Sequence, residues 1–327
     1  MSVPEFELIQ RFFNRHIRGK PEIVLGIGDD AALISPAAEQ HLVIAIDTLV
    51  KGVHFPDTTS PYDIGWKALA VNLSDLAAMG ADPAWFTLAL TLPESSESWL
   101  TAFSRGLFDL ARQYDLPLVG GDTTRGPLTV TVQIAGTVPP GQALLRAGAK
   151  PGDHIYVSGS LGDATLALHL LAGEMPANAA DYPELIARLN RPLPCIAEGR
   201  ALRGIASCAI DISDGLLADL QHILDASDCG AEIFQDHLPF SPAARQLLSH
   251  DPDLWRSLIS GGDDYQLCFC VAAENIPRLK QTMQQYDFHF TEIGRICEGS
   301  ELRCLDTDGK TVEIRARGYS HFAKENQ

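Results

Sequence analysis

Apolar residues in the first half of the chain follow strand spacing and helix spacing in turn. Residues 42–46 are all apolar and are followed by Asp47, which predicts a short buried strand ending in an acid. A helix is predicted next from apolar residues at a spacing of 3.6: Trp66, Leu69, Ala70, Leu73, Leu76 and Ala77. Gly80 is suited to cap its end. Asp75 lies off this stripe, beside Asn72.

A second amphipathic helix and two more strands complete the first half. The helix is indicated by Phe103, Leu107, Leu110, Ala111 and Tyr114. Strands are predicted at 116–119 and 129–135. A connector rich in Pro and Gly follows from residue 139 to residue 153, and we place a domain boundary at its start. The chain therefore divides into residues 1–138 and 139–327.

Strands and helices also mix in the second half. Strands are predicted at 155–158, 209–212 and 265–271, and helices follow the first two, one through Leu171 and one from Leu216. No dinucleotide-type GxGxxG occurs. We therefore predict an α+β or mixed α/β protein of two domains.

Composition excludes several classes of function. With 327 residues, 46% hydrophobic and 20% charged, the chain is an ordinary globular protein of two domains. Its net charge of -17 argues against binding nucleic acid or anionic membranes. No stretch approaches the roughly 18 apolar residues of a membrane span, and no export signal is visible. Seven cysteines without CxxC spacing indicate reduced thiols in the cytoplasm and no zinc site.

Four segments combine glycine with aspartate, at no fixed period. They are Gly26-Ile27-Gly28-Asp29-Asp30, Gly120-Gly121-Asp122, Asp211-Ile212-Ser213-Asp214-Gly215 and Gly261-Gly262-Asp263-Asp264. Each acid alone could be a turn residue that caps nearby N–H groups. Asp47 and Asp75 fit that explanation poorly, because one ends an apolar strand and the other lies inside a helix. The alternative is that the acids form one site.

A shared acidic site requires cations. Two unit charges about 4 Å apart repel by about 4 kcal/mol at an effective dielectric constant near 20. Oxygen ligands without a His/Cys set select Mg²⁺, Mn²⁺ or Ca²⁺, and magnesium commonly bridges to substrate phosphates. The chain has no Walker A motif, protein-kinase signature or G-x-S-x-G elbow. Phosphoryl transfer by another architecture stays open.

A family resemblance rests on seven segments that occur in order along nearly the whole chain. They are GIGDDAA at 26–32, DTLVKGVHF at 47–55, KALAVNLSDLAAMGADP at 67–83, LVGGDTTRG at 118–126, RAGAKPGD at 146–153, DISDGL at 211–216 and SGGDDYQL at 260–267. Together they resemble the thiamine-monophosphate kinase family, within the superfamily of aminoimidazole ribonucleotide synthetase. Single motifs such as GDD would be weak evidence, but the combination is specific.

The resemblance implies a fold and an activity. Residues 1–138 would bind metal and ATP and dimerise, two copies of their sheet closing into a β-barrel. Residues 139–327 would form an α+β domain that completes the active-site cleft. The implied reaction is the ATP-dependent conversion of thiamine monophosphate to thiamine diphosphate, with several Mg²⁺ ions. The expected protein is a cytoplasmic homodimer.

The resemblance also implies site residues by position. The metal ligands would be Asp30, Asp47, Asp75, Asp122, Asp211 and Asp214. The nucleotide contacts would be Gly121, Asp122, Arg146 and Ser213. The contacts to thiamine monophosphate would be His54, Asp263 and Tyr319.

Two departures from the family pattern stand out. Ala45 and Ile46 replace the usual hydroxyl ligands before Asp47, so a backbone carbonyl would have to substitute. Asp263 replaces the usual Glu and keeps the charge on a shorter arm; with Asp264 it would complement the cationic thiazolium ring.

The chemistry of the acceptor makes a general base unnecessary. A phosphate monoester is already anionic at neutral pH, so we expect direct in-line transfer without a phosphoenzyme and without a catalytic base. His54 would contact the acceptor phosphate or be a plain loop residue. Arg146 would neutralise ATP phosphates or form a linker ion pair. Tyr319 would stack on the thiamine or pack the C-terminal tail beside Phe322.

Rival functions are disfavoured by what the sequence lacks. Another ATP-dependent synthetase of the superfamily is the nearest alternative. Selenophosphate synthetases carry a reactive residue near the N-terminus, whereas the first cysteine here is Cys195. Hydrogenase-maturation relatives end in a modifiable cysteine, whereas this chain ends in Gln327. A Ca²⁺-binding structural module would need EF-hand or calcium-repeat spacing, and neither occurs.

Overall fold

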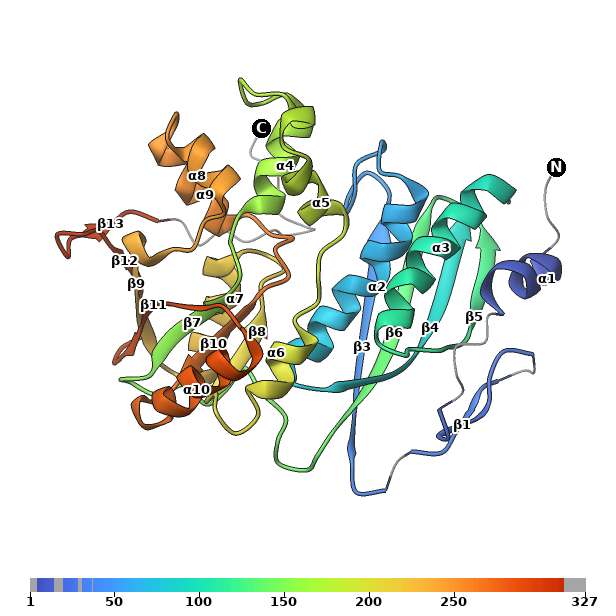
Figure 1. The fold of residues 1–327 in the computed structure, drawn as a ribbon, viewed down its shortest axis with the longest axis horizontal. Coiled ribbons are helices and arrows are strands. Elements are labelled where there is room, and N and C mark those ends of the chain that lie inside the picture. The colour runs from blue at the N-terminus through green and yellow to red at the C-terminus, as the bar shows by residue number, and fades with distance from the viewer. Residues whose placement is uncertain (1–4, 15–19, 29–30, 37, 315–327) are drawn as a thin grey trace. The chain divides into compact units, whose positions relative to one another are not determined.

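The computed structural model describes residues 5–14, 20–28, 31–36 and 38–314. The chain divides into two compact units, Met1–Ala143 and Leu144–Gln327, and each is described by itself (Figure 1). Both units combine a sheet with helices, so the predicted two-domain α+β class is confirmed.

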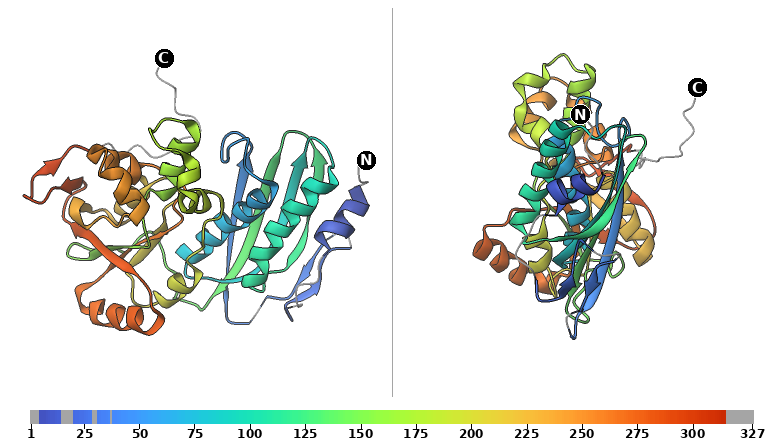
Figure 2. Two further views of the ribbon diagram at one scale, coloured as in Figure 1. Left: turned by 45° about the horizontal axis from the view of Figure 1, so that its top comes forward. Right: turned by 90° about the vertical axis from the view of Figure 1, so that its right-hand side faces the viewer.

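The first unit is built on an open four-stranded sheet. In spatial order its strands are β3 (His41–Val50), β6 (Thr129–Val138), β4 (Asp82–Leu92) and β5 (Leu118–Arg125). Only β4 and β5 run parallel to each other. The two predicted helices are confirmed as α2 (Pro61–Ala78) and α3 (Glu97–Gln113), which lie on the same side of the sheet (Figure 2).

Glycines at two positions let α2 and α3 pack so closely that their backbones are in contact. A Cβ on Gly106 would lie 1.9 Å from the carbonyl oxygen of Tyr62, and one on Gly65 would lie 2.2 Å from that of Phe103. Any side chain at either position would push the helices apart. Ser60 caps the start of α2, where its hydroxyl accepts the N–H of Asp63 at 3.2 Å.

Two predicted strands differ from those observed. The strand at 42–47 was predicted to be buried and to end in Asp47, but β3 continues to Val50 and its residues Leu42, Ile44 and Ile46 are 46%, 54% and 63% exposed. The prediction of burial was wrong because the helices of this unit cover one face of the sheet only. The strand predicted at 116–119 is β5, which begins at Leu118 and runs to Arg125, so Asp122 lies inside this strand and not after it.

Shorter elements complete the first unit. They are α1 (Glu5–Leu8), the π-helix η1 (Ile9–Phe13), and the antiparallel pair β1 (Ile23–Leu25) and β2 (Leu33–Ile34).

The second unit is built on a mixed seven-stranded sheet. In spatial order its strands are β13 (Thr311–Val312), β12 (Leu302–Leu305), β9 (Gly230–Phe234), β11 (Phe290–Cys297), β7 (His154–Ser158), β10 (Leu267–Val271) and β8 (Cys208–Asp211). Only β9 and β12 are parallel neighbours. The predicted strands at 155–158 and 209–212 are confirmed, whereas the strand predicted from Tyr265 starts at Leu267.

Two apolar cores stabilise this unit. The larger one lies between the sheet and α7 (Leu216–Ser227), the helix predicted from Leu216. The smaller one joins α4 (Asp163–Ala172), α5 (Pro183–Asn190) and α8 (Pro242–Leu248). The remaining helices are α6 (Ile196–Ala201), α9 (Trp255–Ser260), α10 (Ile276–Tyr286), η2 (Ala179–Asp181), η3 (Gln235–His237), η4 (Pro252–Leu254) and η5 (Ala273–Asn275).

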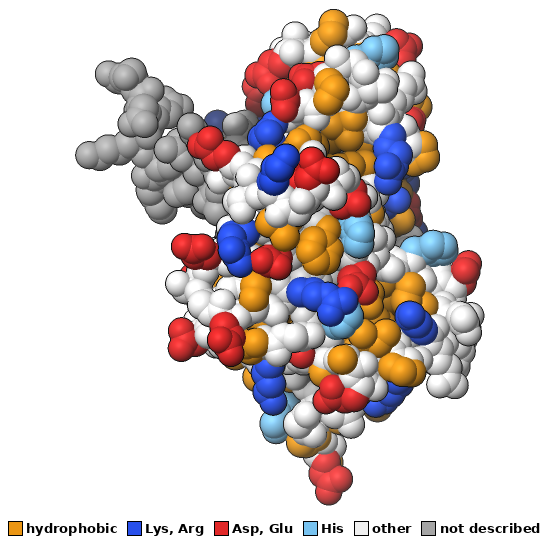
Figure 3. Space-filling view, turned by 90° about the vertical axis from the view of Figure 1, so that its left-hand side faces the viewer, with side chains coloured by type: hydrophobic (Ala, Val, Ile, Leu, Met, Phe, Trp, Pro, Cys, Tyr) orange, Lys and Arg blue, Asp and Glu red, His pale blue; other side chains and the backbone are white. Residues whose placement is uncertain are grey.

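The charge of the surface and the composition of the helices can be compared with the partners expected from the sequence. Lys and Arg side chains are interspersed with Asp and Glu on the face in Figure 3, so this face offers mixed charge to a partner. None of the helices that the structure describes combines the length and the apolar composition needed to span a bilayer.

Candidate active site

One cavity of the first unit brings two of the acidic motifs together. Its volume is about 610 Å³, and residues of the segment 26–32 line it together with Gly120, Gly121 and Asp122 of β5. Asp122 is exposed there. Asp30 lies outside the described residues. Asp122 therefore shares one concave surface with the described residues of the segment 26–32.

The two glycines of β5 differ in what surrounds them. A Cβ on Gly121 would lie 1.9 Å from the carbonyl oxygen of Leu88 on β4, whereas a Cβ on Gly120 would have no heavy atom of the described residues within 4 Å. Gly121 is thus required for the contact between the two strands. Gly120 leaves bare backbone in the cavity.

Asp47 and Asp75 lie elsewhere in the first unit. Asp47 shares the helix-covered face of β3 with Leu49, and Asp75 lies near the end of α2; both are half-buried. Neither lines the cavity formed with Asp122. Within the part of the chain that the structure describes, no three His, Cys, Asp or Glu side chains are grouped closely enough to hold a metal ion.

The backbone of β3 offers an oxygen where the family has a hydroxyl. Lys51 donates its N–H to the carbonyl of Leu128 at 3.2 Å, which continues the register that pairs Ala45 with Ile134. Hydrogen-bonded residues alternate along an antiparallel pair, so Ala45 directs its backbone groups to β6 and Ile46 directs its carbonyl away from it. β3 is an edge strand, and among the described residues no strand pairs with its other side, so the Ile46 carbonyl points out of the sheet.

His54 is held in the turn after β3 by its ring and its backbone. Its Nδ1 accepts the N–H of Val50 at 3.0 Å, and its carbonyl accepts a hydrogen bond of 3.2 Å from Nζ of the buried Lys67. A ring nitrogen that accepts carries no proton, so a neutral His54 carries its proton on Nε2. In this state His54 is a hydrogen-bond donor and not a base.

In the second unit, two motif loops are fastened to each other. Asp263 donates its N–H to the carbonyl of Ser213 at 2.9 Å, and Tyr265 donates to that of Ile212 at 2.8 Å. A Cβ on Gly262 would lie 2.1 Å from the Ser213 carbonyl oxygen, so glycine is needed for this approach. The loops 211–215 and 261–265 therefore bring predicted nucleotide, metal and substrate residues together.

The loop 261–265 has unusual backbone angles. Asp263 and Tyr265 have φ values of 68° and 49°, which side chains other than glycine adopt rarely. Aspartate tolerates this region better than most residues, which fits Asp in place of the family's Glu. The Tyr265 hydroxyl donates to Oδ1 of Asp263 at 2.9 Å and orients its carboxylate.

The side chain of Asp264 caps the start of α4 in the second unit. Its two carboxyl oxygens accept the N–H of Gly162 at 3.0 and 2.8 Å, at the start of α4. Burial is the main reason that its pKa is raised well above the ordinary value. The expectation that both neighbouring acids complement a cationic ring is thus wrong for Asp264, because this side chain caps a helix.

Asp219 is a residue that the sequence reasoning missed. It lies in the first turn of α7 and is buried, and its Oδ2 accepts three backbone N–H groups of the loop 211–215. Burial, and next the charge of Asp211, raises the pKa of Asp219 to about 7. The available signal was an acid in the first turn of a helix that follows a motif loop.

Arg146 and Tyr319 complete the predicted set. Arg146 is exposed, on a segment anchored by the hydrogen bond of 2.9 Å from the N–H of Ala209 to the carbonyl of Leu145. Gly148 also donates to the hydroxyl of Ser227 at 3.1 Å. Tyr319 lies outside the described residues.

A buried polar network connects the thiol of Cys195 to the loop 261–265. The hydroxyl of Ser158 lies 3.5 Å from Sγ of Cys195 and donates to Oε1 of Gln266 at 3.0 Å. Cys195 Sγ lies 3.8 Å from the carbonyl of Tyr265. Burial raises the pKa of Cys195 to about 12, so this thiol is not an activated nucleophile.

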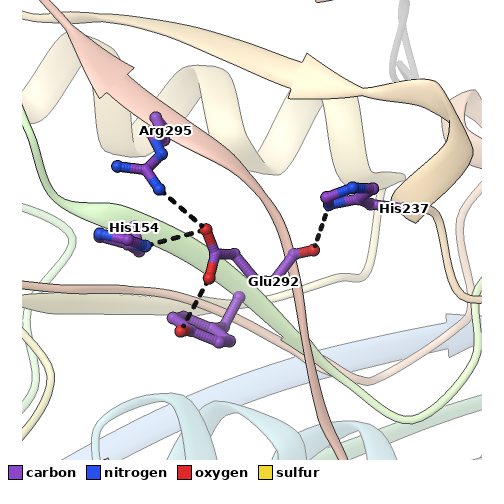
Figure 4. Close-up of polar contacts among 5 residues, drawn as sticks. His154, His237, Glu292 and Arg295 are labelled. Atoms are coloured by element: carbon purple, nitrogen blue, oxygen red, sulfur yellow. Dashed lines mark hydrogen bonds and ion pairs between the residues drawn. The ribbon is translucent and has the colours of Figure 1, made fainter. Parts of the chain in front are cut away.

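A second polar cluster lies on β7 and β11 (Figure 4). The carboxylate of Glu292 is 2.9 Å from Nδ1 of His154, accepts the Tyr156 hydroxyl at 3.1 Å and lies 3.5 Å from Arg295. Burial, and next the charge of Glu292, raises the pKa of Tyr156 to about 12. Three partners on one carboxylate indicate a network that stabilises the sheet.

Comparison with known proteins covers both units. Residues 28–138 match the family described as AIR synthase related protein, N-terminal domain, and residues 150–306 match its C-terminal domain. The thiamine-monophosphate kinase of Escherichia coli (strain K12) is 50% identical over 324 residues, 99% of this chain and 99% of that protein.

Solved structures agree with this match. The thiamine-monophosphate kinase from Stenotrophomonas maltophilia K279a has a TM-score of 0.85 at 50% identity and covers 95% of this chain and 99% of that chain. AaThiL, solved in complex with AMPPCP and TMP, has a TM-score of 0.77 at 33% identity and covers 90% of this chain and 92% of that chain. The resemblance inferred from the motifs is confirmed.

Proposed function

Because the chain belongs to the thiamine-monophosphate kinase family, we propose that it transfers the γ-phosphoryl group of ATP to thiamine monophosphate and forms thiamine diphosphate. The observation that carries this proposal is the 50% identity over 99% of the chain. The solved relative that holds an ATP analogue and TMP supports the same pair of substrates.

The transfer is direct, from ATP to the acceptor phosphate. The acceptor oxygen is already anionic at neutral pH, so it needs positioning and charge neutralisation and no base. The N–H of Val50 on Nδ1 of His54 supports this role, because the neutral ring can then only donate, from Nε2. The protonated thiol of Cys195 gives no support to a phosphoenzyme.

Magnesium is the cofactor that the donor set fits. In the first unit Asp30, Asp47, Asp75 and Asp122 would hold it, and in the second unit Asp211 and Asp214. All are hard oxygen donors, and the Ile46 carbonyl directed away from β6 supplies an oxygen in place of the missing hydroxyl. Bound Mg²⁺ would neutralise the charge of the phosphates and align them for in-line transfer. We propose that several ions take part.

The substrate contacts follow the family positions. Gly121, Asp122, Arg146 and Ser213 would contact the nucleotide, and His54, Asp263 and Tyr319 would contact thiamine monophosphate. The orientation of the Asp263 carboxylate by the Tyr265 hydroxyl supports a contact to the cationic ring. The exposed guanidinium of Arg146 supports a contact to phosphate.

The chain acts as a homodimer in this proposal. Leu42, Ile44 and Ile46 form an exposed apolar row on β3, and a second copy of the sheet would cover it and close the barrel. Light scattering should give twice the monomer mass, and Ile44→Lys should reduce it to the monomer. A parent protein that is monomeric at micromolar concentration would contradict this part. The seven unpaired cysteines support a cytoplasmic location.

The activity is tested by supplying both candidate acceptors. Pure protein is incubated with ATP, Mg²⁺ and either thiamine monophosphate or thiamine, and the products are separated by chromatography. We expect thiamine diphosphate from the monophosphate and no product from thiamine. Efficient phosphorylation of free thiamine, or no product from either acceptor, would overturn the proposal. Metal binding that ignores a nonhydrolysable ATP analogue would instead indicate a metal-binding module.

A further inference from the structure

Three consecutive N–H groups of the loop 211–215 converge on a single oxygen. Ser213, Asp214 and Gly215 donate to Oδ2 of Asp219 at 3.0, 3.0 and 3.1 Å. Asp219 is only 3% exposed. The loop also packs closely against the end of α9, since a Cβ on Gly215 would lie 2.6 Å from the carbonyl oxygen of Ser260. One carboxyl group and one glycine therefore help to fix the conformation of this loop, together with the hydrogen bonds that Asp263 and Tyr265 donate to its backbone.

The position of these N–H groups is one at which proteins commonly bind phosphate. A glycine-containing loop between a strand, here β8, and the start of a helix, here α7, presents amides to an anion. In this chain the oxygen at that position belongs to Asp219 in the first turn of the same helix. The start of α4 after β7 is similar, because the carboxyl of Asp264 takes the N–H of Gly162.

We propose that Asp219 is a positioning residue: its carboxyl group fixes the loop 211–215 so that the Asp211 and Asp214 side chains are ready to bind metal, and it occupies the amides that a phosphate would otherwise take. Nucleotide phosphate then does not bind these amides. The inference rests on the proposed function, because that function gives Asp211 and Asp214 their ligand role. It adds a residue outside the predicted set of site residues.

The first test needs no variant. Amide hydrogen exchange of the parent protein is measured at pH 8.5 with a chelator, then with Mg²⁺ and AMPPCP. We expect the amides of 213–215 to be protected already in the free protein, because their acceptor is part of the chain. If they exchange freely without ligand and become protected only with the nucleotide, phosphate is their partner and the proposal is overturned.

The second test compares two buried carboxyl groups that accept backbone N–H groups. Asp219→Asn keeps the size of the side chain and weakens its bonds to the loop. Asp153→Asn is the matched control, because Asp153 is 5% exposed and its Oδ2 accepts the N–H of Lys150 at 3.2 Å in a turn away from the loop. Calorimetry then measures the Mg²⁺ concentration that gives half-maximal AMPPCP binding.

We expect Asp219→Asn to raise that Mg²⁺ concentration by roughly 10- to 100-fold, the usual effect of losing a group that orients metal ligands. Asp153→Asn should leave it within about twofold, whatever its effect on the melting temperature. Equal Mg²⁺ dependence of Asp219→Asn and the parent would overturn the proposal, and so would an equal loss in both variants. If Asp219→Asn does not fold, the exchange measurement on the parent decides.

This design separates the inference from the proposed function. A parent protein that binds AMPPCP in the presence of Mg²⁺ but forms no thiamine diphosphate contradicts the function only. A parent that is fully active while the amides of 213–215 are unprotected contradicts the role of Asp219 only.

Discussion

Gly121→Ala is expected to disturb the candidate site through the sheet, already in the protein without ligand. The new Cβ would lie 1.9 Å from the carbonyl oxygen of Leu88, whereas real Cβ atoms essentially never come closer than 3.0 Å to such an atom. β4 and β5 must therefore separate by at least 3.0 − 1.9 = 1.1 Å at this point. The next pair in the register is Ala89 with Asp122, so the candidate metal ligand moves with the strand.

The size of the effect follows from this overlap. Overpacking of a well-packed contact typically costs about 1–3 kcal/mol. With an unfolding entropy of about 2.1 cal/mol/K per residue, this lowers the melting temperature of the 327-residue chain by about 1.5–4.5 °C. A displacement near 1 Å of a group that positions substrate can reduce activity by about 10²-fold. We therefore expect Gly121→Ala to lose both stability and most of its activity.

The neighbouring glycine is the control. Among the residues that the structure describes, none has a heavy atom within 4 Å of a Cβ on Gly120, so Gly120→Ala should melt within about 1 °C of the parent. Calorimetric melts of the three proteins, with a chelator present, give the comparison. If the two variants melt alike, or if Gly121→Ala keeps the parent's melting temperature, the packing explanation for Gly121 is refuted.

Four further variants test other parts of the structure. The pKa of Asp264 is raised, so its carboxyl contributes most to stability below about pH 4 and loses that contribution as the pH rises through the folded-state pKa. With a chelator present, the melting temperature of Asp264→Asn relative to that of the parent should therefore rise between pH 5 and pH 9, and a constant difference would contradict the shift. Lys67→Met removes the donor to the His54 carbonyl, so KM for the acceptor should rise about tenfold with a smaller change in kcat; a collapse of kcat alone would assign His54 to the chemistry. Tyr156→Phe should lower the free energy of unfolding by about 1–2 kcal/mol in urea, because its carboxylate partner loses one of three contacts, and an unchanged midpoint would show that the hydroxyl adds nothing. With a chelator, Asp75→Asn should melt no lower than the parent and gain much less stability from Mg²⁺ with AMPPCP; a destabilised free variant with a normal gain would indicate a structural acid.

Much of the fold could be predicted because burial on one face leaves a periodic pattern. The apolar stripe of α2 predicted a helix at nearly the right bounds, and the strand predicted at 155–158 is β7. The exposed face of β3 could not be predicted, since a continuous apolar run looks the same whether its second face is covered by the same chain or by another. The full length of β5 could not be predicted, because two adjacent glycines are typical of a strand end. Here the strand continues through Gly120 and Gly121, and Gly121 lets the carbonyl of Leu88 on β4 approach closely.

The site was predictable at the level of motifs and less so at the level of side chains. The pattern singled out the loops 211–215 and 261–265, and the structure fastens them together through the backbone of Ser213 and Asp263. Asp219 escaped notice because an acid in the first turn is common in any helix, and only the fold shows that three loop amides point to it.

The adjacent acids 263 and 264 show how the chain tolerates like charges in one motif. The left-handed backbone at Asp263 separates the two side chains, so that one reaches the Tyr265 hydroxyl and the other the start of α4. Burial keeps Asp264 protonated over a wider pH range than an ordinary aspartate, which reduces the repulsion between the neighbours. The charge that the loop presents is then chiefly that of Asp263. A single charged carboxylate in this loop fits the proposed contact between Asp263 and the cationic ring of the substrate, and a second charged acid beside it would add repulsion.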